Sequence, residues 1–251
     1  LKWAVVFFFV SFCFCYYFAT DIYKFLVAPL YDIYIEKGIE NPRMIYTALT
    51  EAFFTFLKVS FYGALFISFP IIALQMYKFA APGLYKDEKK AFLPFLIATP
   101  VLFGSGAALV YYFIFPLAWR FFLGFQTSTI ESGMAIELEA KVNEYLSLVL
   151  KLMFAFGLAF QIPVALTLLS RAGIVQSDDL KKRRKYAIVL AFVVAAILTP
   201  PDLISQIGLG IPIIILFEIS IILAKFFEKK KDQNKSKNKI KKNIGDTDYS
   251  E

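Results

Sequence analysis

Long uncharged apolar runs alternate with short charged connections along this chain. About 20 predominantly apolar residues are needed to cross roughly 30 Å of hydrocarbon. Six runs meet this criterion to different degrees, and they cover residues 2–19, 57–78, 91–119, 145–170, 186–200 and 207–224. The pattern predicts an all-α membrane protein, with six transmembrane helices in residues 1–227.

The break between the last two runs lies in "AILTPPDLISQIGLGIP". Within one long span, Pro200, Pro201 and Asp202 would leave freed backbone groups and a charge in hydrocarbon. A tight turn between two short spans is therefore predicted. The fifth run is about 15 residues, which at about 1.5 Å each gives only some 22 Å and indicates a locally thinned bilayer.

Basic residues are concentrated in alternate connections. One set holds Lys78, Lys86, Lys89 and Lys90, then six basic residues between 171 and 185, then nine lysines from Lys225 onward, whereas the opposite set holds seven. The positive side of a membrane protein faces the cytoplasm, which predicts that both termini are cytoplasmic. Residues 228–251 are polar and lysine-rich, so we expect a disordered cytoplasmic tail that anchors at anionic lipid.

The composition excludes several classes of function. The chain is 59% hydrophobic and has no histidine and two cysteines, which argues against a usual His/Cys metal site and against histidine-based catalysis. No phosphate-binding loop, zinc-protease or serine-hydrolase motif is present. We therefore expect no enzyme activity and no cofactor, and the net charge of +7 reflects membrane topology rather than nucleic-acid binding.

Two polar residues fall near the middle of predicted spans, Gln161 in the fourth and Glu218 in the sixth. An ionisable group in hydrocarbon is costly and needs a partner, which the sequence leaves open for Glu218. Gln161 fits either an ordinary interhelical hydrogen bond or a transport role. A small-molecule or ion secondary transporter that uses both residues is the alternative function.

Small residues recur along one face of the fifth predicted span, at Ala187, Ala191, Ala195 and Thr199. Such a stripe allows close approach of another helix, either a partner helix or a helix of this chain. A second small-residue run, residues 104–108, favours packing within the chain.

The first cytoplasmic connection, "KFAAPGLYKDEKK", presents Asp87 and Glu88 among lysines. It is either a solvated charged turn or a carboxylate site for a cationic ligand, most effectively arginine.

Several stretches together resemble the TatC family, the polytopic core subunit of the twin-arginine protein translocase. They are "KFAAPGLYKDEKK", "EYLSLVLKLMFAFGLAFQIPVALTLLSRAGIV", "DDLKKRRKYAIVLAFVVAAILTPPDLISQ" and "IPIIILFEISIILAKF". The resemblance covers most of the chain up to about Phe227. It implies a cupped bundle of six helices that binds twin-arginine signal peptides on its cytoplasmic face. It also implies an oligomeric assembly with single-span partners of the TatA and TatB type, which move folded proteins under the proton-motive force. The membrane would be the bacterial cytoplasmic (inner) membrane, or that of an organelle.

The resemblance also assigns roles to residues. It places signal-peptide binding at Glu88, in a loop with Pro82, Tyr85 and Lys86. A second recognition glutamate is expected in a segment ahead of Leu1. Gln161 stands where the family often has glutamate, and Glu218 matches an acidic position in the last span. Partner helices are expected at the turn and stripe formed by Thr199, Pro200, Asp202, Gln206 and Ala195.

Overall fold

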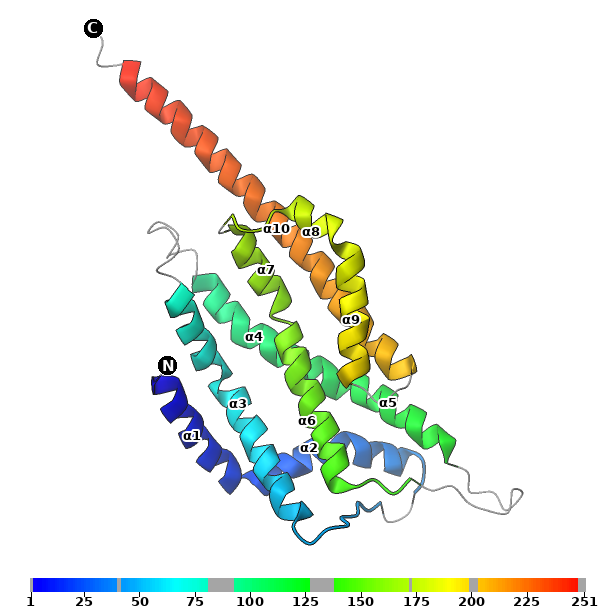
Figure 1. Ribbon diagram of the computed structural model, residues 1–251. Helices are drawn as coiled ribbons and strands as arrows, with labels where there is room; N and C mark the ends of the chain where they lie inside the picture. The colour runs from blue at the N-terminus through cyan, green and yellow to red at the C-terminus, as the bar shows by residue number, and fades with distance from the viewer. Residues whose placement is uncertain are drawn as a thin grey trace.

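The computed structural model describes residues 2–39, 42–80, 93–126, 138–171, 173–198 and 203–247. In these ranges the regular structure is helical, and β pairing is limited to an isolated bridge between Ile45 and Lys141. The prediction of an all-α protein is confirmed (Figure 1). The α-helices are α1 (Lys2–Tyr17), α2 (Ala19–Glu36), α3 (Glu51–Ala80), α4 (Leu93–Leu109), α5 (Phe115–Phe122), α6 (Val142–Ala159), α7 (Ile162–Arg171), α8 (Ser177–Lys182), α9 (Arg184–Leu198) and α10 (Leu203–Thr247).

Among the described residues, four helical segments are long and apolar enough to cross a membrane: Glu51–Met76, Leu96–Phe125, Val142–Ser170 and Gln206–Glu228. Helices α1 and α2 form a fifth candidate only if they count as one broken span, because they are bent by 73°. Helix α9 has 15 residues, as its short apolar run predicted. The count of six spans and the cytoplasmic location of the termini stay predictions.

Helix α2 lies almost entirely between the first two apolar runs, in a segment that hydropathy did not predict as a span. The segment forms a helix because its apolar residues share one face: Leu26, Leu30 and Ile33 are buried at helical spacing. Charged residues occupy other positions, which kept the segment below the hydropathy of a span. Figure 1 shows α2 running across the lower parts of α3 and α6, where it caps this end of the bundle.

Pro29 lies inside α2 and shapes the contacts of this helix. A proline has no N–H, so the carbonyl of Phe25, four residues earlier, loses its helical donor. The Tyr111 hydroxyl donates to that carbonyl at 2.8 Å, and the Tyr145 hydroxyl donates to the Leu26 carbonyl at 2.9 Å. Two tyrosines from other helices therefore hold the cap to the bundle.

Helices α4 and α6 approach closely through glycines. A Cβ atom on Gly106 would lie 2.7 Å from the Phe156 carbonyl oxygen, and one on Gly157 would lie 2.5 Å from the Phe103 ring. Both distances are far below a normal contact, so a larger residue at either position would push the helices apart. The internal packing expected for residues 104–108 is confirmed at Gly106.

The fourth predicted span is one helical run with a break. Helix α6 ends at Ala159 and α7 begins at Ile162. Pro163 explains the break, because it cannot donate to the Ala159 carbonyl and its ring crowds the preceding turn. The break places Gln161 at the corner between the two helices.

The C-terminal helices form a second packed unit. Helix α9 and the first half of α10 run antiparallel, and Leu180 of α8 packs on Ile221 and Ala224 of α10 (Figure 1). The last span is longer than predicted, since its apolar part reaches Glu228 and α10 continues to Thr247. A disordered tail was expected from residue 228. Residues 228–247 instead continue the helix, because they include no proline, and no glycine before Gly245, and are rich in lysine, a good helix former.

Candidate functional site

The predicted site residues divide into two groups. Pro82, Tyr85, Lys86 and Glu88, in the connection between the second and third predicted spans, lie outside the described residues. So do Thr199, Pro200 and Asp202, where a turn was predicted. The structure places the remaining four, Gln161, Ala195, Gln206 and Glu218, in the helical bundle.

Gln161 joins the corner between α6 and α7 to α4. Its Nε2 atom donates to the Thr99 carbonyl at 3.0 Å, and the Gly157 carbonyl lies at 3.4 Å. The interhelical hydrogen bond is therefore present. The Oε1 atom is buried and has no hydrogen-bond donor among the described residues. This site uses the amide as a donor to backbone carbonyls, which an ionised carboxylate could not do.

Glu218 has a partner that sequence reasoning left open. Its Oε2 atom lies 2.7 Å from Nη2 of Arg184, and the two side chains are 40% and 48% exposed. Arg184 is the first residue of α9, so the start of α9 lies level with the middle of the apolar part of α10. Because α9 is short, its first residue lies beside Glu218, and the Arg184 guanidinium balances the charge of the carboxylate.

Gln161 and Glu218 do not share a hydrogen-bond network. Gln161 binds the backbone of α4 and of its own helix, whereas Glu218 binds α9. The structure therefore does not assemble the two residues into the single polar site that a transporter of the proposed kind would use.

The small-residue stripe of α9 faces inward. Ala191 and Ala195 are 2% and 0% exposed. Helix α10 approaches on this side, where Gly210 lies against the Phe192 ring. The middle of the stripe is thus engaged in packing within the chain.

The opposite face of α9 is apolar and open. Val189, Val193 and Ile197 are exposed at intervals of four residues. Hydropathy alone could not separate this face from the buried one, because both are apolar. Beside it, Gln206 near the start of α10 directs Nε2 to the Phe192 carbonyl at 3.4 Å.

The sequence model of the family described as Sec-independent protein translocase protein (TatC) matches residues 1–212. The chain belongs to the TatC family. It is therefore a subunit of the twin-arginine translocase, a protein-transport component of the bacterial inner membrane and not an enzyme.

Individual relatives agree with this assignment. TatC of Magnetococcus marinus is 51% identical over 227 residues, which are 90% of this chain and 80% of that protein. TatC of Escherichia coli K12 is 41% identical over 211 residues, covering 84% and 78%. A crystal structure of the twin arginine translocase receptor TatC superposes with a TM-score of 0.76 at 36% identity, covering 91% of this chain and 96% of that one.

Proposed function

We propose that this TatC protein binds twin-arginine signal peptides on its cytoplasmic face and scaffolds TatA- and TatB-type partners for transport of folded proteins under the proton-motive force. The observation that carries the proposal is the structural likeness, over nearly the whole chain, to a protein described as the twin arginine translocase receptor. The family match across residues 1–212 supports it independently.

The signal-peptide site is proposed at Glu88, in the loop with Pro82, Tyr85 and Lys86. The reasoning is chemical, because these residues lie outside the described part of the chain. A carboxylate pairs with guanidinium through charge-assisted bonds that are often bidentate, a geometry that lysine cannot reproduce. Glu88 would therefore discriminate paired arginines from paired lysines.

Partner helices are proposed to dock at the outer face of α9 and the turn that follows it. The exposed Val189, Val193 and Ile197 offer an apolar stripe to a single membrane helix. At the end of this stripe, Gln206, with Thr199, Pro200 and Asp202, would supply polar contacts. Ala195 would contribute indirectly to partner docking, because its small, buried side chain lets α9 pack closely against the bundle.

A transporter is less well supported. It requires Gln161 and Glu218 to serve one ligand, yet each is engaged with a different helix.

Export of a twin-arginine reporter tests the signal-peptide site. We expect Glu88→Ala to reduce export strongly and Glu88→Lys to abolish it, with both variants present in the membrane at the normal level. Asp87→Ala is the matched control, since it removes the adjacent carboxylate and should leave export near normal. Normal export by Glu88→Lys would refute the assignment.

A further inference from the structure

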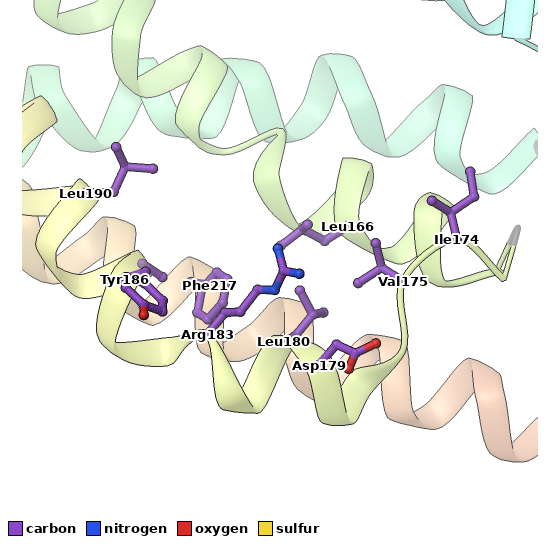
Figure 2. Close-up of a pocket in the computed structure, with 10 residues that line it drawn as sticks. Leu166, Ile174, Val175, Asp179, Leu180, Arg183, Tyr186, Leu190 and Phe217 are labelled. Atoms are coloured by element: carbon purple, nitrogen blue, oxygen red, sulfur yellow. The ribbon is translucent and has the colours of Figure 1, made fainter.

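A cavity of about 340 Å³ lies between α7, α8, α9 and α10, apart from the residues proposed above. Its wall is mostly apolar, with contributions from Leu166, Val175, Leu190 and Phe217 (Figure 2). Binding pockets for small ligands range from roughly 300 to 1,000 Å³. The cavity is therefore large enough to hold part of a ligand.

Arg183 brings a positive charge into this apolar setting. Figure 2 shows its side chain rising from the turn between α8 and α9 toward Leu166, with Leu180 and Phe217 beside it. Within the described residues, the Arg183 guanidinium has no hydrogen bond and no ion pair. The nearby Lys181 and Arg184 are already paired, with Asp178 and Glu218.

Arg183 is exposed at the edge of the cavity, so its five N–H donors are accessible to an occupant. An anion bound at Arg183 would satisfy several of them at once. Phosphate is well suited because it accepts two parallel hydrogen bonds from guanidinium.

The surrounding charge also favours an anion. Residues 178–185 contain five basic and two acidic side chains. Asp179 lines the cavity, but in Figure 2 its carboxylate points away from the Arg183 guanidinium. The Lys181–Asp178 and Arg184–Glu218 pairs each use one of the basic groups, and Arg183 is the basic residue that lines the cavity.

The cavity also opens toward the apolar surface of the bundle. Ile174 and Leu190 line it and are 70% and 62% exposed. In a membrane, an exposed apolar side chain on a helix, such as Leu190, is suited to contact with lipid chains. An occupant that suits both parts of the cavity needs an anionic head group at Arg183 and a hydrocarbon chain along Leu190.

We propose that this cavity is a specific site for an anionic phospholipid, with the phosphate bound by Arg183 and one acyl chain lying along the apolar wall. Basic pockets between membrane helices commonly hold the head groups of anionic lipids. The site lies on the side of the bundle that carries the basic connection 171–185. A bound lipid would fill the space between α8 and the α9–α10 pair and brace the short helix α9.

Native mass spectrometry of the purified full-length chain in an uncharged detergent tests the site. Three probes are compared: phosphatidylglycerol, phosphatidylcholine and glycerol phosphate. We expect retention of one phosphatidylglycerol in preference to phosphatidylcholine. Glycerol phosphate should compete poorly, because it has the phosphate and lacks the chains.

Variants then locate the site. Arg183→Gln should weaken phosphatidylglycerol binding about fivefold or more, as expected for loss of one basic contact at the membrane surface. Leu190→Trp, at the exposed rim, should weaken it by narrowing the entry. Lys182→Gln removes the adjacent charge outside the cavity and should change binding less than twofold. Monodisperse elution and an unchanged helical circular dichroism spectrum show that each variant is folded.

Four results would overturn the proposal. Equal losses in Arg183→Gln and Lys182→Gln would indicate attraction by general surface charge. Unchanged binding in Arg183→Gln would remove the head-group contact. Competition by glycerol phosphate as strong as by the lipid would indicate a simple phosphate site. Displacement of the lipid by a synthetic TatA-type membrane helix would assign the cavity to a partner helix.

Discussion

Removing the Tyr111 hydroxyl group tests why α2 tolerates a proline in its middle. Tyr111→Phe keeps the ring, which stacks on Phe25 at a centroid distance of 4.5 Å and an interplanar angle of 3°. It deletes only the 2.8 Å hydrogen bond to the Phe25 carbonyl. Because Pro29 removes the helical donor for that carbonyl, the substitution leaves it without a protein donor.

The expected magnitude follows from this geometry. Hydrogen bonds between membrane helices average about 0.6 kcal/mol and reach about 1.7 kcal/mol. We expect a loss near the upper value, about 1.5 kcal/mol, since the carbonyl gains no replacement donor. Pro29→Ala restores an N–H at position 29, so in that background Tyr111→Phe should cost less than about 0.5 kcal/mol.

Reversible unfolding in mixed micelles measures these free energies as a double-mutant cycle. Tyr112→Phe is the matched control: its side chain is exposed, and it should change the free energy of unfolding by less than about 0.5 kcal/mol. A cost for Tyr111→Phe that is equal with proline and with alanine at position 29 would refute the reasoning. The hydroxyl would then stabilise the bundle by some means other than compensating for the proline.

Two further predictions concern the site and the bundle core. Glu218→Gln should destabilise the α9–α10 pair by up to about 1 kcal/mol, because both charges are partly exposed. In the same unfolding assay, Glu218→Arg alone should also lower stability. Combining it with Arg184→Glu restores opposite charges and should recover most of that loss. Failure of the exchange to recover stability would show that the ion pair contributes nothing. Gly157→Leu should lower the free energy of unfolding by about 1–3 kcal/mol or more, because its side chain must displace the Phe103 ring. Gly104→Leu, with open space around the added Cβ, should cost far less. Similar losses in the two variants would contradict the close α4–α6 packing.

The apolar runs predicted most of the helices, because a segment that crosses the hydrocarbon core of a bilayer must be long and apolar. It did not predict α2, whose charged residues share the segment with a buried apolar face. It predicted residues 145–170 as one span, which agrees with the candidate span Val142–Ser170, but it did not predict the helix break next to Pro163 where Gln161 makes its interhelical contact. Pro163 indicates where the helix can break, but the geometry of the break between α6 and α7 depends on how α4 packs beside it.

The sequence predicts parts of the candidate site where the chemistry is local. The turn at Pro200–Asp202 and the role of Glu88 are inferred from short stretches of sequence outside the described residues, and both stay predictions. The partner of Glu218 could not be predicted, because Arg184 lies 34 residues away and the pair depends on how far α9 extends beside α10. The inward and outward faces of α9 likewise became distinct only through the contacts with α10.

Photo-crosslinking at the loop tests the central claim most directly. A photoreactive amino acid replaces Tyr85, so that Glu88 remains intact, and a labelled twin-arginine signal peptide is added to membranes containing the protein. We expect an adduct with the twin-arginine peptide, and its yield should fall sharply when both arginines are replaced by lysines and when Glu88→Lys is introduced. Adducts of equal yield with the twin-arginine and twin-lysine peptides would contradict this expectation.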